Sequence, residues 1–290
     1  MEKVNIQGFR GLNVTVNLKK VNIVVGENGT GKTSFLEALF LSTLFQSDMS
    51  ENDINTLFLY AMSSGGDSLS AFSSLSDSTV VLDNNTVTFK KKDSYSLEVD
   101  INGEKVTEVN KMELLSEPLF SPSVKVYKKV DNGYFPVYIS TFFDRSGNLE
   151  RIFSIAKRKN RKIKTEFEIL QDKYGQFKLY YDLLPAYVIG RGILKREMIK
   201  FGLKASNLLL IDEIEDSLHP DMIVQVLKEI REGNTQILLT THVNEVIKMV
   251  NKIFDENEAL VLYLTREGYK AYKLSEISEF EMPLSWLGYV

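Results

Sequence analysis

The chain has 290 residues, of which 43% are hydrophobic and 26% are charged, and its formal net charge is −4. This composition supports one large globular domain or two modest ones, and it gives no overall electrostatic attraction for nucleic acid. The absence of cysteine excludes disulfides, thiolate-bound zinc and thiol nucleophiles. Because no apolar run approaches the ~20 residues that span a bilayer and no signal peptide begins the chain, we expect a cytoplasmic protein without membrane contact.

The first 45 residues predict two strands, a glycine-rich loop and a helix. Apolar residues at every second position over 14–18 indicate a half-exposed strand. The run VNIVV at 21–25 is typical of a strand buried on both faces. It is followed by GENGTGKT at 26–33, and residues 34–45 then carry apolar side chains on a helical period.

The middle of the chain differs from the first 45 residues in composition and in the spacing of its apolar residues. Residues 46–79 are rich in serine and predict a loop with one short helix at 57–62. Strand and hairpin signals follow between residues 80 and 140 and predict antiparallel pairing. Apolar residues then return to a helical spacing over 147–175, where we expect a helix.

The last third returns to alternating strands and helices. The sequence predicts buried strands at 207–211 and 236–242, a helix at 220–232 that begins with Pro220, and a closing hairpin at 259–274. The expected fold is therefore α/β. We expect a core split into 1–48 and 180–290, interrupted at 49–179 by an inserted antiparallel β and helical region.

GENGTGKT matches the phosphate-binding pattern G-x-x-x-x-G-K-[ST] between a buried strand and a helix. Its glycines let backbone N–H groups surround phosphate oxygens at the start of the helix. Lys32 would reach the β- and γ-phosphates, Thr33 would bind Mg²⁺, and Ser34 could touch the α-phosphate. The nucleotide-binding residues that we expect here are Asn28, Gly29, Thr30, Gly31, Lys32, Thr33 and Ser34.

Four carboxylates follow the buried strand in the stretch LLLIDEIEDSLHP at 208–220. Like charges ~4 Å apart repel by about 1 kcal/mol in water and about 4 kcal/mol at an effective dielectric of 20. A divalent cation would relieve this repulsion, so we expect Asp212 to bind Mg²⁺ and Glu213 to orient or deprotonate the attacking water. For Glu215 and Asp216, we weigh two interpretations equally: a role in the metal site, or solvent-exposed acids that cap the next helix.

The chain has two histidines, and they have different predicted roles. His242 ends the strand QILLTTH, and we interpret it as the sensor of the γ-phosphate, although a strand-end histidine without a catalytic role is the alternative. His219 directly precedes Pro220 and is better explained as a helix-start residue.

GENGTGKT, LLLIDEIEDSLHP and QILLTTH, in this order and with a long insertion, resemble the ABC-type ATPases of the RecF, SMC and OLD group. The FRG at residues 9–11 adds to the resemblance, which places Arg10 among the nucleotide-binding residues. The resemblance implies that the α/β core at 1–48 and 180–290 is a P-loop NTPase fold with a mixed sheet and acts as an ATPase. It also implies ATP and Mg²⁺ as cofactors and Lys32, Glu213 and His242 as catalytic residues. It also implies that two heads close face to face over ATP as a homodimer.

In such a dimer each ATP also touches a signature helix of the other head. Residues 184–199 have the place and shape of that segment, with Gly190 and Gly192 presented to the partner's γ-phosphate. The usual serine is missing, and Arg191 stands there instead. Either Arg191 supplies positive charge across the interface or the contact between heads is weakened. A segment near Tyr138 to Thr141 occupies the place of the glutamine loop.

Three functions compete. The first is an ATPase coupled to DNA repair or defence, with DNA contacting the run KRKNRKIK from Lys157 to Lys164; the wet face of a helix is the alternative for that run. The second is a low-turnover ATP-dependent switch that regulates a partner chain without nucleic-acid contact. The third is the motor subunit of a membrane transporter. The absence of an LSGGQ-type loop from this sequence argues against it. The chain ends 48 residues after His242, too few for the nuclease domain of OLD proteins, so we expect a stand-alone head.

Overall fold

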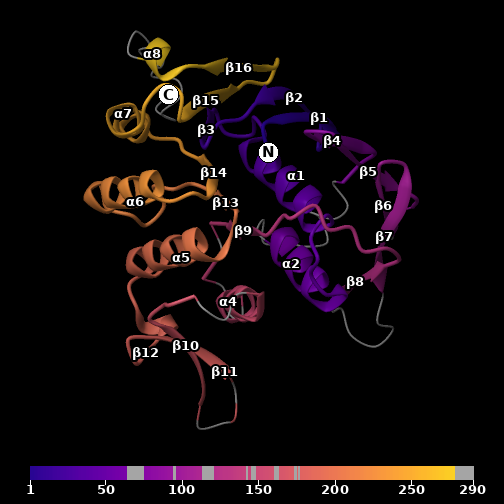
Figure 1. Cartoon of the computed structure of the whole chain (residues 1–290), viewed down its shortest axis with the longest axis horizontal. Helices are drawn as coiled ribbons and strands as arrows, with labels where there is room; N and C mark the ends of the chain where they lie inside the picture. The colour runs from indigo at the N-terminus through magenta and orange to yellow at the C-terminus, as the bar shows by residue number, and fades with distance from the viewer. Residues whose placement is uncertain are drawn as a thin grey trace.

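The computed structural model describes residues 1–63, 75–93, 96–112, 121–141, 143–144, 148–159, 163–172, 175 and 177–277. Within these residues the chain forms two large sheets with helices between them and on one outer face (Figure 1).

The six-stranded sheet is mixed, as the sequence predicts. Five strands run parallel, and only β16 pairs antiparallel at the edge. In spatial order the strands are β16 (Tyr269–Tyr272), β15 (Ala259–Leu264), β3 (Val21–Gly26), β14 (Gln236–Thr240), β13 (Leu208–Ile211) and β9 (Pro136–Ile139). Every residue of β3, β13 and β9 is buried, which explains their continuous apolar runs.

The seven-stranded sheet is antiparallel throughout. Its order is β2 (Leu12–Asn17), β1 (Lys3–Phe9), β4 (Ser78–Leu82), β5 (Asn85–Lys91), β6 (Ser96–Ile101), β7 (Glu104–Met112) and β8 (Ser121–Val126). The described side chains alternate between buried and partly exposed along β4 and β5, as expected when one face of a sheet packs on a core.

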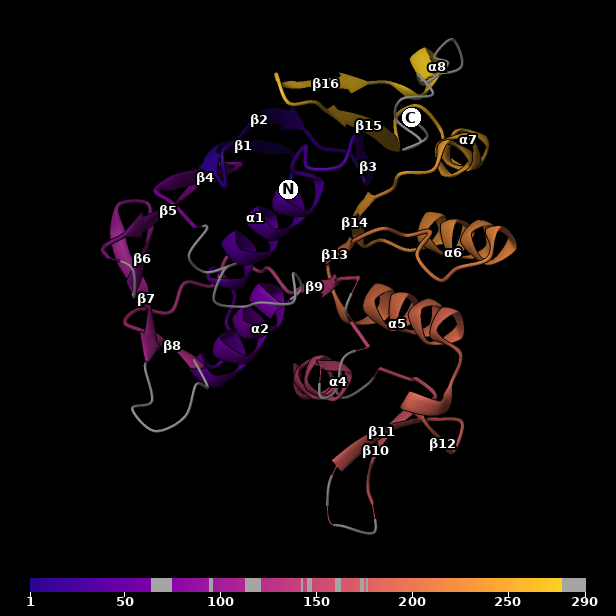
Figure 2. The same ribbon diagram turned by 180° about the vertical axis from the view of Figure 1, so that it is seen from behind.

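Helices α1 (Lys32–Leu44) and α2 (Glu51–Ser63) lie between the two sheets, whereas α5 (Arg191–Ala205), α6 (Pro220–Glu232) and α7 (Asn244–Ile253) cover the other face of the mixed sheet (Figures 1 and 2). Helix α1 contacts strands of both sheets, and this position explains why its side chains are buried on nearly every side. Helices α6 and α7 bury one face only.

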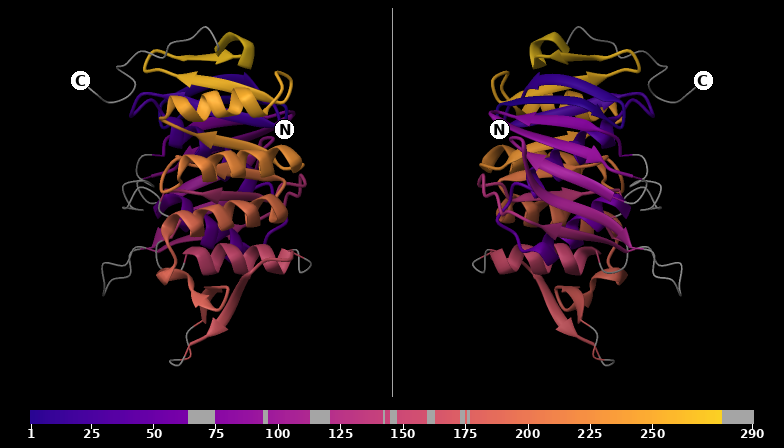
Figure 3. Two further views of the ribbon diagram at one scale, coloured as in Figure 1. Left: turned by 90° about the vertical axis from the view of Figure 1, so that its left-hand side faces the viewer. Right: turned by 90° about the vertical axis from the view of Figure 1, so that its right-hand side faces the viewer.

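The remaining elements lie at one end of the molecule and at the sheet edge. Helix α4 continues the row of α5, α6 and α7 (Figure 3), and next to it lies a small three-stranded sheet. Their bounds are α4 (Asn148–Lys159), β10 (Phe167–Gln171), β11 (Phe177–Tyr181), β12 (Leu184–Pro185) and the 3-10 turn Ala186–Val188, and the short α8 (Leu274–Ile277) follows β16. No helix among the described residues is both long enough and apolar enough to cross a bilayer.

Two helices predicted for the middle of the chain are present, but their extents differ from the prediction. The helix predicted over 147–175 is present as α4 but ends at Lys159. Residues Phe167–Gln171 form β10 instead and pair antiparallel with β11. Helix α2 spans 13 residues where the sequence predicted a loop with a short helix at 57–62. Packing of α2 against α1 and β8 stabilises a segment whose polar first turn has little helical pattern of its own.

The expected insertion at 49–179 is not a separate block in the structure. Its strand β9 pairs with β13 in the mixed sheet, and its strand β4 pairs with the N-terminal β1. Residues from this range therefore complete both sheets of the core.

Candidate functional site

The loop between β3 and α1 has the backbone that the phosphate-binding motif requires. Gly26, Gly29 and Gly31 have φ values of 152°, 77° and 97°, which side-chain-bearing residues rarely adopt. A Cβ at Gly26 would also lie 2.3 Å from the carbonyl oxygen of Leu264 on β15. The glycines therefore allow both the turn of the loop and its close packing on the neighbouring strand.

Lys32 begins α1, and its ammonium group lies inside the loop. The Nζ atom donates to the carbonyl oxygens of Gly26 at 2.9 Å and Glu27 at 2.8 Å, and the residue is 6% exposed. Burial lowers the pKa of Lys32, and the nearby charge of Glu213 opposes that shift. The cation is thus fixed where phosphate oxygens would approach the loop.

Asp212 and Thr33 meet across the site. Asp212 directly follows β13, and its carboxylate accepts from the Thr33 hydroxyl at 3.1 Å and from the Thr240 hydroxyl at 2.7 Å. Burial raises the pKa of Asp212, while these hydroxyl donors oppose the shift. A hydroxyl and a carboxylate this close fit two ligands of one Mg²⁺, a cation that commonly takes few protein ligands beside phosphate and water.

Glu213 is held in a left-handed backbone conformation with a φ of 46°. Its side chain lies 3.2 Å from His242 Nε2, and this hydrogen bond lowers the pKa of Glu213. The backbone N–H of His242 donates to the Glu215 carboxylate at 2.6 Å, so Glu215 fixes the backbone at the histidine. The pair of Glu213 and His242 presents an ionised carboxylate and an imidazole to the same space.

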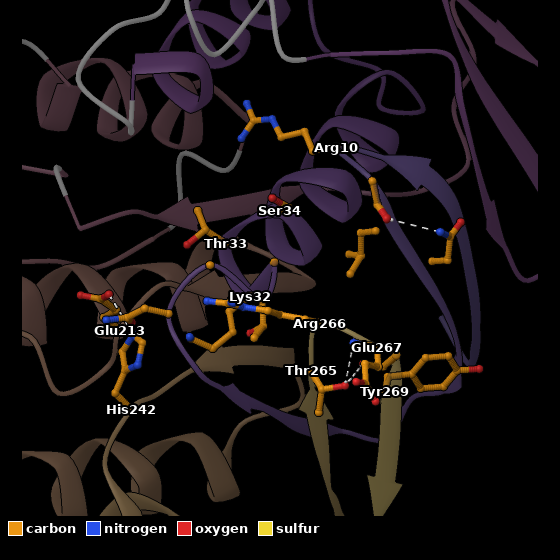
Figure 4. Close-up of a pocket in the computed structure, with 18 residues that line it drawn as sticks. Arg10, Lys32, Thr33, Ser34, Glu213, His242, Thr265, Arg266, Glu267 and Tyr269 are labelled. Atoms are coloured by element: carbon orange, nitrogen blue, oxygen red, sulfur yellow. Dashed lines mark hydrogen bonds and ion pairs between the residues drawn. The ribbon is translucent and has the colours of Figure 1, made fainter. Parts of the chain in front are cut away.

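Lys32, Thr33, Glu213 and His242 line one cavity of about 1070 Å³ (Figure 4), whereas Asp212 is hydrogen-bonded to Thr33 but is not itself a lining residue. Its walls come from the phosphate loop, the ends of β13 and β14, and two hairpin turns. The lining residues are Arg10, Gly11, Leu12, Asn13, Asn28, Gly29, Thr30, Gly31, Lys32, Thr33, Ser34, Glu213, His242, Thr265, Arg266, Glu267, Gly268 and Tyr269. All seven nucleotide-binding residues expected in the loop line this cavity. Glu213 and His242, both expected to be catalytic, line it as well.

Arg10 also lines the cavity, and it forms an ion pair with Glu37 of α1.

Gly190 and Gly192 lie at the start of α5, outside the cavity lining. A Cβ at Gly192 would be 2.3 Å from the Ser217 carbonyl oxygen, whereas Gly190 has open space around it. The start of α5 therefore packs closely on the loop that follows Glu213.

Arg191 is bound within its own chain. Its guanidinium donates to Asp144 at 2.9 Å and Asp216 at 2.9 Å, and it also bonds the Thr141 carbonyl oxygen. Asp216 is thus an ion-pair partner rather than a solvated acid. His219 caps α6 as predicted, because its Nδ1 accepts from the Asp221 N–H at 3.3 Å.

Three features of the site are absent from the sequence prediction. Thr240 orients Asp212 and also accepts from the Glu213 N–H at 2.7 Å. Lys195 of α5 is fully buried and donates to the Glu213 carbonyl oxygen at 2.6 Å. The turn at residues 265–269 forms a wall of the cavity. The TTH ending of β14 carried a signal for Thr240, whereas Lys195 and the turn lie in segments without a recognisable motif.

The family comparison agrees with this site. Residues 1–184 match the model of the AAA ATPase domain family, which covers more than half of the chain. The chain belongs to the AAA ATPase domain family. Residues 175–248, which hold Asp212, Glu213 and His242, match the family described as "AAA domain, putative AbiEii toxin, Type IV TA system". The predicted ABC-type P-loop ATPase of the RecF/SMC group is confirmed at the level of family and fold class.

Solved structures with low sequence identity are also similar to this AAA ATPase chain. The SMC head domain from Thermotoga maritima is 15% identical, with 94% of this chain and 98% of that chain covered and a TM-score of 0.41. The Smc head from Pyrococcus furiosus bound to the C-terminal domain of ScpA is 13% identical, with 96% and 97% covered and a TM-score of 0.46. An ATP-binding cassette of an ABC transporter is 11% identical, with 96% and 97% covered and a TM-score of 0.45. A search of curated proteins found no match.

Proposed function

We propose that this AAA ATPase binds Mg-ATP in the cavity around Lys32 and hydrolyses it to ADP and phosphate. The observation that carries the proposal is that Lys32, Thr33, Glu213 and His242 all line that cavity, with Asp212 hydrogen-bonded to Thr33 and His242 to Glu213. A cation, a metal-ligand pair and a general base are the parts that phosphoryl transfer to water needs.

Each residue has a defined task in this proposal. The loop N–H groups and Lys32 bind the phosphates, and Thr33 and Asp212 hold Mg²⁺, which would neutralise charge on the β- and γ-phosphates. Glu213 orients the attacking water and accepts its proton, and its lowered pKa keeps the carboxylate ionised at neutral pH. His242 positions Glu213 through its Nε2 atom and, in this proposal, contacts the γ-phosphate.

Closure of two copies over ATP is part of the proposal. The start of α5 carries Gly190 outside the cavity, so this surface is free to face a nucleotide on another copy. Around it, Tyr187, Val188 and Ile193 are 78%, 58% and 47% exposed. An interface between heads would remove this apolar surface from water, which favours association.

Two variants test the chemistry. Lys32→Ala should abolish ATP binding because the phosphates lose their main cation. Glu213→Gln should keep ATP binding and lower hydrolysis by at least about 100-fold, because glutamine cannot accept the proton. Calorimetric titration with Mg-ATP and phosphate release measure the two properties separately. Normal ATP affinity in Lys32→Ala, or normal hydrolysis in Glu213→Gln, would contradict the proposal.

A low-turnover switch that regulates a separate effector chain is the second candidate function. It is favoured by Arg191, which is engaged by Asp144 and Asp216 of its own chain and would have to leave them to reach a partner's nucleotide. A slow hydrolysis rate that does not increase on dimer formation would favour this candidate over the ATPase with rapid turnover.

A role in DNA repair or defence, with nucleic-acid contact at the basic run, is the least supported part of the proposal. In the described part of the run, Arg158 and Lys159 form ion pairs with Asp53 and Asp48, so part of its positive charge is already neutralised. Removing the charges between Lys157 and Lys164 should flatten any dependence of DNA affinity on salt concentration. Unchanged DNA affinity in that variant would assign the run a structural role.

A further inference from the structure

The cavity extends well beyond the phosphate loop. Two hairpin turns form its outer walls. One is residues 10–13, the turn after β1 together with the first two residues of β2, and the other is residues 265–269, the turn after β15 together with the first residue of β16. A nucleotide whose phosphates bind the loop must place its sugar and base along this outer part. The two turns are therefore the chain's own candidates for recognising the nucleoside.

The turn at 265–269 is fixed next to the phosphate loop by the sheet itself. Strand β15 pairs in parallel with β3, and Leu264, the last residue of β15, lies opposite Gly26, the last residue of β3. The space that a Cβ at Gly26 would need is taken by the Leu264 carbonyl oxygen. Loop and turn thus leave the same edge of the sheet from adjacent, tightly packed positions.

The turn is also rigid. The Thr265 N–H and hydroxyl both donate to the Gly268 carbonyl oxygen, at 2.8 Å and 3.1 Å. The Glu267 N–H donates to the Thr265 hydroxyl oxygen at 3.2 Å, and Gly268 has a φ of 156°. A wall that is ordered before binding loses little conformational entropy when a ligand arrives.

Two side chains of the turn suit a nucleoside. Tyr269 is 40% exposed and offers an aromatic face, and Arg266 is exposed, with no ion pair or hydrogen bond to its side chain recorded among the described residues. In Figure 4, Arg266 extends from the turn to the side of Lys32 and Tyr269 extends to the opposite side. On the other wall Leu12 packs on the phosphate loop, because its Cδ1 would lie 3.2 Å from a Cβ at Gly31.

We propose that the turn at 265–269 is the nucleoside-binding wall of the site. A purine base stacks on Tyr269 in the space that Leu12 bounds on the other side, and Arg266 donates to the ribose and the adjoining phosphate. An aromatic ring and an aliphatic side chain match the flat apolar faces of a base. This inference rests on the proposed binding of a nucleoside triphosphate.

The test compares ATP with inorganic tripolyphosphate, a ligand that has the phosphates but no nucleoside. Tyr269→Ala should weaken Mg-ATP binding at least about five-fold, the loss typical for one stacked base, and leave the affinity for tripolyphosphate unchanged. Tyr269→Phe should retain ATP affinity. Lys270→Ala, next on the strand and outside the cavity lining, is the matched control and should bind both ligands normally.

The other outcomes separate this inference from the proposed function. Unchanged ATP affinity in Tyr269→Ala, with binding abolished in Lys32→Ala, overturns the nucleoside wall and leaves the ATP site intact. An equal loss of affinity for ATP and tripolyphosphate also overturns it, because the turn would then act on the phosphates or on the fold. If the unaltered protein binds neither ligand, the proposed function fails and this inference fails with it.

Discussion

At the scale of single residues, Lys195 of α5 contacts the backbone of Glu213, the proposed general base. Its Nζ donates to the Glu213 carbonyl oxygen at 2.6 Å and lies 3.8 Å from Asp216. Burial lowers the pKa of Lys195 to about 8, and the surrounding carboxylates oppose that shift. This amine supports the left-handed backbone of Glu213, so we regard Lys195 as a positioning residue.

Lys195→Met should lower kcat for ATP hydrolysis about ten-fold or more while ATP affinity changes little. Methionine fills a similar volume but leaves a buried carbonyl oxygen unsatisfied, which costs about 1–3 kcal/mol of stability. Lys200→Met is the matched control, because Lys200 lies on the same helix and pairs only with Glu197 and Glu229 in the described residues. A parallel loss of ATP affinity and kcat would assign Lys195 a purely structural role.

Gly192 and Gly190 form a matched pair for testing how tightly α5 packs on the loop after Glu213. Gly192→Ala should lower the free energy of unfolding by about 1–3 kcal/mol, since its Cβ would overlap the Ser217 carbonyl oxygen. Gly190→Ala has open space and a φ of −55°, so it should leave stability almost unchanged. Thermal unfolding of both variants measures the difference. Equal melting temperatures would show that the loop at Ser217 moves away from the added methyl group without loss of stability, which would contradict tight packing.

At the scale of elements, α2 supports the end of β9. The Ser140 N–H, directly after β9, donates to the Tyr60 hydroxyl at 3.0 Å, and both residues are buried. Tyr60→Phe should therefore cost about 1–3 kcal/mol, because a buried N–H loses its partner. In the control Tyr127→Phe, the lost bond is exposed and the cost should stay below about 1 kcal/mol. Denaturant unfolding distinguishes the two, and equal losses would contradict the role of Tyr60.

The elements around the site could be predicted from the sequence because each carries a strong local signal. VNIVV before the glycine loop became β3, and Pro220 after His219 marked the first turn of α6. The hairpin at 259–274 is confirmed as β15 and β16. In each case the periodicity or turn chemistry of the segment agrees with its tertiary environment.

The elements that the sequence mispredicted depend on distant partners. The apolar spacing over 147–175 fits a helix as well as a helix followed by a hairpin, and contacts of α4 and β11 decide between them. The place of β9 between 49 and 179 could not be seen because a parallel strand owes its position to β13, about 70 residues further along the chain. Lys195 was missed for a similar reason, since it is buried where α5 packs on the sheet and on the segment that follows β13.

At the scale of the whole molecule, the parallel sheet concentrates the chemistry at one edge. Strands β3, β14 and β13 lie side by side and point the same way, so the phosphate loop, His242 and the acids all follow carboxyl ends of neighbouring strands. Gly190 directly precedes α5 and does not line this cavity, and α5 itself lies on the outer face of the mixed sheet (Figure 1). One chain thus carries two separate surfaces that two copies could bring together over ATP.

The solution mass of Glu213→Gln, measured by light scattering with and without Mg-ATP, tests this account most directly. The variant should bind ATP without hydrolysing it, so we expect a change from monomer to dimer only when Mg-ATP is present. Gly190→Arg, which places a bulky side chain on the proposed contact surface, should bind ATP and stay monomeric in the same background. If Glu213→Gln binds ATP and its mass does not change, closure of two copies over the nucleotide is wrong.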